Sequence, residues 1–251
     1  ATSEDLTGQS GGTYTVTLSD GNGCTISSTF VIAEPSALSV ADQITDVVCF
    51  GALNGGIDLT VTGGLPSYSF QWSNTATSED LAGLSGGTYT VTITDANACT
   101  TVQTYFVFEP TQLMVSFTQV DVSCNGLTDG SIDVSVLGGT VPYTYDWNSG
   151  TYTTEDLSGL AAGTYNLVVT DANSCTAIAT VTIIEPSALG LGGIVVDVSC
   201  NGIQDGSIDV SASGGTLPYA YAWNTGATSE DLTGQSGGTY TVTLSDGNGC
   251  T

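Results

Sequence analysis

The sequence contains no lysine, no arginine and no histidine, whereas aspartate and glutamate together number 25. Every ionised side chain therefore has the same sign at neutral pH, and side-chain salt bridges are excluded. The chain also lacks imidazole, which is the usual general base and metal ligand near pH 7, and the cationic groups that bind phosphates. These absences argue against nucleotide and nucleic-acid partners.

Long apolar runs are missing as well. No run reaches the roughly 18 residues that a membrane helix needs, and the first residues contain no positively charged, apolar leader. The chain is nevertheless expected to fold, because 40% of its residues are hydrophobic and Val, Ile, Tyr and Thr alternate in short runs typical of strands. We expect an all-β protein whose targeting signals lie outside this segment.

An internal repeat organises the chain. Residues 1–25 recur letter for letter as residues 227–251, and within that span one unit returns about every 75 residues. The Glu-Pro pairs at 34–35, 109–110 and 185–186 each follow an apolar run and are interpreted as domain joints, because proline ends a ladder and stiffens a linker. The predicted segments are the C-terminal part of a repeat at 1–35, complete repeats at 36–110 and 111–186, and a repeat lacking its last strand at 187–251. Neither end resembles a capping repeat, so we expect a longer native protein.

Each unit is predicted to be a string of short strands, which in the unit 111–186 cover residues 113–123, 131–137, 143–147, 163–170 and 176–184. One Trp on a middle strand and a late Gly-Thr-Tyr are typical of an immunoglobulin-like sandwich with a tyrosine corner. Leu167 stands where an antibody domain has a core Cys. We therefore expect tandem immunoglobulin-like β-sandwich repeats that form an elongated rod with an aliphatic and aromatic core. The predicted core aromatics are Trp72, Trp147, Trp223, Tyr89, Tyr165 and Tyr240.

Seven cysteines recur at two positions per unit, one before a Gly-containing loop and one in an Asp-x-Asn-x-Cys turn. The spacing lacks a Cys-x-x-Cys pair, which argues against zinc and favours disulfides in an oxidising, extracellular setting. Bridges within each repeat are favoured, but three alternatives stay open: a short bridge across the Glu-Pro joint, a bridge between loops of neighbouring domains, and free thiols. The favoured pairs are Cys49 with Cys99, Cys124 with Cys175, and Cys200 with Cys250, with Cys24 bonded to an upstream partner.

Carboxylates gather in the predicted loops, and their oxygens suit calcium better than zinc. A solvated acidic surface is the simpler interpretation, since no run matches an EF-hand or an Asp-rich nonapeptide loop. No cofactor is expected otherwise. The candidate calcium ligands are Asp129, Asp133, Glu155, Asp156 and Asp171.

Three segments carry a family resemblance: residues 124–134 (CNGLTDGSIDV), residues 138–147 (GGTVPYTYDW) and residues 155–175, from Glu-Asp-Leu to Asp-Ala-Asn-Ser-Cys. Together they resemble the SprB-type repeat, which forms tandem arrays in very large cell-surface adhesins of gliding Bacteroidetes-type bacteria. The resemblance implies export by the type IX secretion system, a place at the cell surface, and a part in gliding motility.

The leading hypothesis is a non-enzymatic stalk or filament segment of a secreted adhesin, in which adjacent repeats of one long chain are the main partners. Two alternatives stay open. The repeats themselves could bind polysaccharide or other extracellular surfaces multivalently, or chains could self-assemble into a fibre or sheath. Acidic pairs recur in every unit, as at Glu79-Asp80 and Glu230-Asp231, which favours a structural role over catalysis.

Overall fold

The computed structural model describes residues 4–251, and every regular element in that range is a β-strand. Residues 1–3, at the start of the predicted segment 1–35, lie outside the described residues. Over the described range, no helix is long and apolar enough to span a membrane. The all-β prediction is confirmed.

The chain divides into two compact units, Ala1–Pro110 and Thr111–Thr251, which are described separately. The strands of the first unit are β1 (Gly12–Ser19), β2 (Thr25–Ile32), β3 (Ser39–Thr45), β4 (Gly55–Thr62), β5 (Ser69–Trp72), β6 (Leu81–Leu84), β7 (Gly87–Thr94) and β8 (Thr100–Val107). The strands of the second unit are β9 (Met114–Val120), β10 (Gly130–Leu137), β11 (Thr144–Trp147), β12 (Leu157–Leu160), β13 (Gly163–Thr170), β14 (Thr176–Ile183), β15 (Gly190–Val196), β16 (Gly206–Ser213), β17 (Ala220–Trp223), β18 (Leu232–Gln235) and β19 (Val242–Ser245).

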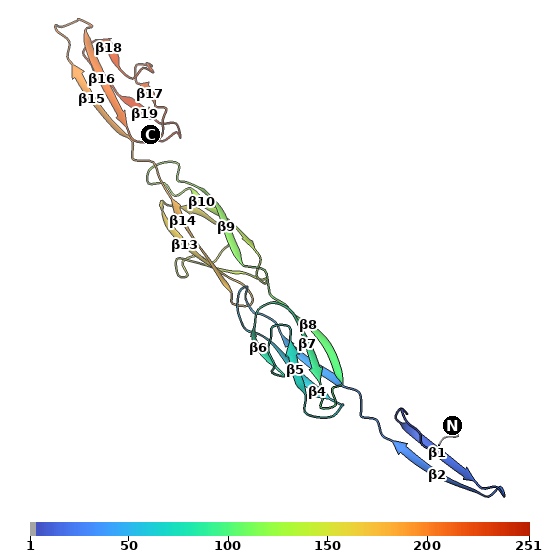
Figure 1. Cartoon of the computed structure of the whole chain (residues 1–251). Helices are drawn as coiled ribbons and strands as arrows, with labels where there is room; N and C mark the ends of the chain where they lie inside the picture. The colour runs from blue at the N-terminus through green and yellow to red at the C-terminus, as the bar shows by residue number, and fades with distance from the viewer. Residues whose placement is uncertain (1–3) are drawn as a thin grey trace. The chain divides into compact units, whose positions relative to one another are not determined.

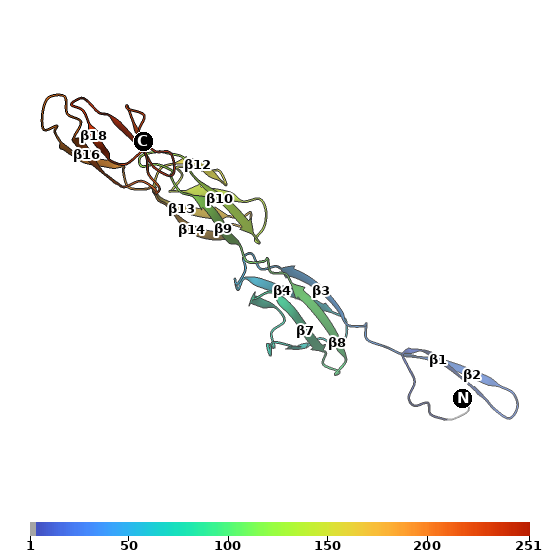
Figure 2. The same ribbon diagram turned by 90° about the horizontal axis from the view of Figure 1, so that it is seen from above.

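Two repeats are complete sandwiches with the same topology. In residues 36–110 the sheets have the strand orders β3-β4-β6 and β5-β7-β8, and in residues 111–186 the orders are β9-β10-β12 and β11-β13-β14. All pairs are antiparallel. Figure 1 shows the β9–β10 and β13–β14 pairs as separate layers, and Figure 2 shows the same for β3–β4 and β7–β8. In each repeat the first, second and fourth strands form one sheet, and the third, fifth and sixth strands form the other. This is the order of an immunoglobulin-like sandwich, which confirms the predicted fold class.

Side-chain alternation explains the strands. In β10, Ile132 and Val134 are buried while Asp133 faces solvent, so each strand has one apolar face and one polar face. The prediction for 163–170 matches β13, and that for 113–123 is longer than β9 at both ends. Strand β12 was missed because four residues are too few to show alternation, although both of its leucines are buried.

The tryptophans anchor the cores. Trp72, Trp147 and Trp223 have exposed fractions of 2%, 0% and 6%. Each indole N–H donates to a backbone carbonyl oxygen six or seven residues later, as from Trp147 to Thr154 at 3.0 Å. The polar end of each indole is therefore satisfied inside the core, as burial of a tryptophan requires.

The predicted tyrosine corner is present in each repeat. The hydroxyl of Tyr89 donates to the carbonyl oxygen of Ser85 at 3.0 Å, and Tyr165 and Tyr240 make the same contact four residues upstream. Leu167 is 1% exposed, so an aliphatic side chain fills the place where antibody domains have a cysteine.

We predict that removing the Tyr89 hydroxyl destabilises its repeat. Tyr89→Phe leaves the Ser85 carbonyl oxygen without its donor, which lowers the free energy of unfolding by about 1 kcal/mol. Tyr105 is the matched control, because it is 7% exposed in the same core and its hydroxyl makes no hydrogen bond within residues 4–251. Tyr105→Phe should change stability by less than about 0.5 kcal/mol. Equal effects in urea denaturation would contradict a role for the corner bond.

Candidate functional site

A buried aspartate builds the turn that carries the second cysteine of each repeat. Asp246 is 7% exposed, and its carboxylate accepts the backbone N–H groups of Thr216 (2.8 Å), Asn248 (2.9 Å) and Cys250 (2.9 Å). Asp95 and Asp171 make equivalent sets of bonds in the two complete repeats. Because the chain has no cationic side chain, backbone N–H groups, and not a salt bridge, stabilise these buried carboxylates.

These hydrogen bonds lower the pKa of Asp95 and of Asp246. The N–H of Leu65, followed by that of Cys99, lowers the pKa of Asp95 below its usual value. Burial acts to raise the pKa of Asp246, but the N–H groups of Thr216, Cys250 and its neighbours outweigh burial and leave the pKa lowered. Both carboxylates are therefore held in the charged form.

A second aspartate shapes the loop that carries the first cysteine. Ser123 donates its backbone N–H to Oδ1 of Asp129 at 3.0 Å and its hydroxyl to Oδ2. The hydroxyl bond is the main cause that lowers the pKa of Asp129, and Ser199 acts in the same way on Asp205. In the repeat 36–110 the amide oxygen of Asn54 takes the same position.

The Glu-Pro joint folds back onto this first-cysteine loop. Oε2 of Glu185 accepts the N–H of Gly126 at 2.6 Å, and the carbonyl oxygen of Pro186 accepts the side-chain N–H of Asn125 at 3.1 Å. In the first unit, Glu109 accepts the N–H of Gly51 at 2.6 Å. The glutamate thus fixes the loop against the end of its own repeat.

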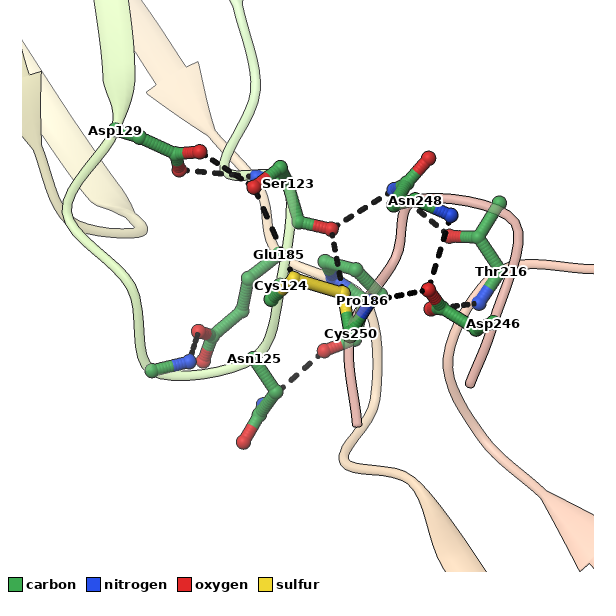
Figure 3. Close-up of a disulfide and its surroundings, with 11 residues drawn as sticks. Ser123, Cys124, Asn125, Asp129, Glu185, Pro186, Thr216, Asp246, Asn248 and Cys250 are labelled. Carbon is green, nitrogen blue, oxygen red and sulfur yellow. Dashed lines mark hydrogen bonds between the residues drawn. A yellow bond between two sulfur atoms is a disulfide. The ribbon is translucent and has the colours of Figure 1, made fainter. Parts of the chain in front are cut away.

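In the second unit the two kinds of cysteine meet across the joint (Figure 3). Cys124, in the first-cysteine loop of the repeat 111–186, forms a disulfide with Cys250, in the Asp246 turn of the repeat 187–251, with Cα atoms 5.7 Å apart. The side chain of Asn248 donates to the carbonyl oxygen of Ser123 at 2.8 Å. The disulfide and the Asn248 hydrogen bond therefore both connect these two repeats.

The favoured disulfide pairing is wrong. Cys124 bonds Cys250 and not Cys175, Cys200 is a free, exposed thiol, and Cys99 is also free, so it does not bond Cys49. Cys49 and Cys175 are each disulfide-bonded. Both cysteines of a repeat lie in end loops, but at opposite ends of the sandwich, so the bridge that forms is the one between neighbouring domains. Cys24 is a free, exposed thiol in the structure, and its predicted upstream partner stays a prediction.

The predicted calcium ligands make separate contacts. Asp129 and Asp171 hold loops, Asp156 accepts the N–H of Val134 at 2.8 Å, and Asp133 is exposed on β10. Burial, followed by a hydrogen bond to Glu155, raises the pKa of Tyr145 to about 12. Within residues 4–251, no three acidic or cysteine side chains are grouped as a metal site. Calcium binding stays a prediction.

Comparison with known proteins identifies the repeats. Residues 41–77, 116–152 and 192–228 each match the family model described as the SprB repeat. No curated protein sequence matches the chain.

Solved structures with weak similarity include adhesion proteins. One is a C-terminal 282-residue fragment of intimin in complex with the translocated intimin receptor intimin-binding domain, at 15% identity and a TM-score of 0.35 over 63% of this chain and 67% of that one. Another is the N-terminal eight Ig domains of Down syndrome cell adhesion molecule, at 9% identity and a TM-score of 0.25 over 85% of this chain. The match spans 44% of that second structure.

We predict that the stabilising effect of the Asp95 carboxylate disappears in acid. Its folded pKa lies below the ordinary value of an aspartate, so its contribution is complete above the unfolded pKa and is lost as the pH falls through the folded pKa. Asp95→Asn should therefore be less stable than the parent at pH 7, and the difference should shrink between pH 5 and pH 2. Acid also protonates the other carboxylates and so weakens their mutual repulsion in both proteins. The difference in stability between the two proteins does not contain this shared effect. A pH-independent difference in urea denaturation would contradict this role.

We also predict that the bridge restrains the linker between the two repeats that it connects. In the double variant Cys124→Ser/Cys250→Ser, amide hydrogen exchange in the linker residues 187–189 should accelerate by about tenfold or more, as local opening becomes easier. Exchange at the buried residues Leu167 and Val169 should also accelerate, because it requires unfolding of the loop that the bridge closes. Cys200→Ser is the matched control, since it removes a free thiol from the equivalent loop.

Proposed function

The chain carries three SprB repeats, and from this premise we propose that it is a load-bearing stalk segment of a secreted bacterial cell-surface adhesin. In this proposal the repeats hold a binding region away from the cell and transmit tension to it. No catalytic reaction is assigned to the chain. Oxidised cysteines support an extracellular location, because cytosolic thiols are kept reduced.

The disulfide between repeats is the observation that carries the proposal. Cys124 lies near the start of its repeat and Cys250 near the end of the next, with a sequence separation of 126. Tension applied across the second unit enters at β9, crosses the S–S bond and leaves at Thr251. Under tension applied between residues 111 and 251, residues 125–249, which include most strands of both repeats, lie outside this covalent path and are not extended while the bond is intact.

The bridge also resists unfolding at equilibrium. Closing a loop of 126 residues stabilises the folded state by about 5 kcal/mol on the chain-entropy model, which is comparable to the whole stability of a small domain. The hydrogen bonds from Asn248 to Ser123 and from Asn125 to Pro186 then fix the joint geometrically. A stalk needs this combination of extension limit and stability.

The net charge of −25 fits the same function. With no cationic side chain, neighbouring carboxylates repel at distances below the Debye length of about 8 Å at physiological salt. This repulsion favours an extended, soluble chain and opposes non-specific collapse. Export by the type IX system and a part in gliding motility are the finer elements of the proposal, and they follow from the family resemblance alone.

We predict that the oxidised second unit has a short extension limit. With handles attached through unnatural amino acids at Thr111 and Thr251, the parent should stretch about 430 Å less than Cys124→Ser/Cys250→Ser, since 126 residues span about 3.4 Å each. Single-molecule force spectroscopy measures this difference directly. Equal contour lengths would contradict the load-bearing function.

A glycan array separates the stalk from a repeat that binds polysaccharide itself. The proposal predicts no glycan binding by the oxidised chain above that of Trp147→Phe, because Trp147 is fully buried and offers no stacking surface. Strong glycan binding by the parent would favour the multivalent binding function instead.

A further inference from the structure

The joint of the second unit contains two Asn-Gly pairs, Asn125-Gly126 and Asn248-Gly249. An Asn followed by Gly is open to deamidation, because glycine has no side chain to hinder attack of its backbone nitrogen on the preceding side-chain amide. The reaction replaces an N–H donor with a carboxylate, which only accepts hydrogen bonds. Both asparagine side chains donate hydrogen bonds at this joint, so deamidation of either one removes a contact that fixes it.

Asn125 is the less reactive of the two. The N–H of Gly126, which must lose its proton before its nitrogen can attack, donates to Oε2 of Glu185 at 2.6 Å. A negative carboxylate at this distance opposes removal of the proton, since deprotonation places two negative charges side by side. The N–H of Gly249 donates instead to the backbone carbonyl oxygen of Asp246 at 3.0 Å, which carries no full charge. The second pair is therefore the more reactive one.

The side chain of Asn248 has two partners in the closed joint (Figure 3). Its amide nitrogen donates to the carbonyl oxygen of Ser123 at 2.8 Å and to the hydroxyl oxygen of Thr216 at 3.2 Å. Cyclisation requires the side-chain carbonyl carbon to rotate toward the nitrogen of Gly249, which breaks these bonds. Both Asn248 and Gly249 are exposed, so water can reach them. The Ser123 bond spans two repeats, and opening of the joint removes its restraint on the reaction.

From these contacts we propose that Asn248 is a deamidation site that the closed joint suppresses, and that its conversion to an acid opposes re-closure of an opened joint. The Gly249 nitrogen loses its proton to hydroxide and attacks Cγ of Asn248. The bond from Cγ to Nδ2 then breaks, and ammonia leaves with a proton taken from water. Water opens the resulting five-membered succinimide by adding to either of its carbonyl carbons, which gives aspartate or isoaspartate. Asparagine and water thus become an acid and ammonia, without an oxidant or a reductant.

The product opposes closure in two ways. An ionised carboxylate at position 248 has no hydrogen to donate, so the carbonyl oxygen of Ser123 faces an acceptor in place of the present 2.8 Å bond. The new charge also lies two residues from the carboxylate of Asp246, in a chain with no cationic side chain to neutralise it. Reduction of the Cys124–Cys250 bond is reversible, whereas loss of ammonia is not. Deamidation therefore makes a temporary opening permanent.

The rate of deamidation at Asn248 tests the site. The oxidised parent and Cys124→Ser/Cys250→Ser are incubated at mildly alkaline pH, reduced, and digested with chymotrypsin, since the chain offers trypsin no Lys or Arg. Mass spectrometry should find conversion about fivefold faster in the double variant, which is the effect of one lost hydrogen bond. The parent incubated with a reducing agent should react like the variant. Equal rates at Asn248 in the oxidised and opened proteins would overturn the proposal.

Asn22 is the internal reference for these rates. It lies in residues 20–24, which have the same sequence as residues 246–250 and the same backbone hydrogen bonds within the turn. Its conversion should be equally fast in the oxidised and opened proteins, because its turn contains neither cysteine of the bridge. An acceleration at Asn22 equal to that at Asn248 would refute suppression by the joint.

Asn248→Asp tests the consequence of the reaction, and Asn22→Asp is the matched control, because it adds the same charge to a turn of the same sequence. In a buffer of reduced and oxidised glutathione, the equilibrium constant for forming the Cys124–Cys250 bond should be at least about fivefold lower in Asn248→Asp than in the parent. Asn22→Asp should leave this constant unchanged. If Asn248→Asp forms the bond as readily as the parent, the acid does not oppose closure and the proposal is wrong.

Discussion

Hydrogen bonding of backbone N–H groups to aspartate carboxylates is the interaction on which this structure depends. A chain with 25 acidic residues and no cationic side chain has no ion pairs to stabilise its loops. Asp95, Asp171 and Asp246 are nevertheless nearly buried, and each is surrounded by backbone donors. The same groups that neutralise the cost of burial fix the turn, and the turn fixes the position of a cysteine. The hydrogen bonds from backbone N–H groups to the aspartate thus determine where the disulfide forms.

That covalent link acts between repeats. Each sandwich already has a core of Trp, Leu, Ile and Val that needs no disulfide, since the place of the antibody cysteine is filled by Leu167 or Val91. Cysteines at the ends of the sandwich are therefore available for the joint. The Glu-Pro linker, the first-cysteine loop and the aspartate turn meet there, so one short stretch of structure controls both the stability of the joint and its response to tension.

The sequence predicted the repeat, the all-β class and most strands, because these depend on patterns within a few residues of each other. Alternation located Gly163–Thr170 as β13, and the Gly-Thr-Tyr motif indicated the corner that Tyr165 makes. It missed Leu157–Leu160, which is too short for alternation. It named Asp129 and Asp171 as candidate calcium ligands, because a carboxylate in a loop has the same letters whether it binds calcium or a backbone N–H; the structure adds the N–H partners of these carboxylates, and calcium binding stays a prediction.

What the sequence determined by itself is the repeat length, the strand periodicity, the uniform charge and the two cysteine positions in every unit. These properties are local or simply periodic. The partner of each cysteine was decided only by tertiary structure, because spacing cannot show that the loop of Cys124 and the turn of Cys175 lie at opposite ends of one sandwich. The fold brings Cys124 to Cys250 through the stacking of two repeats in the second unit.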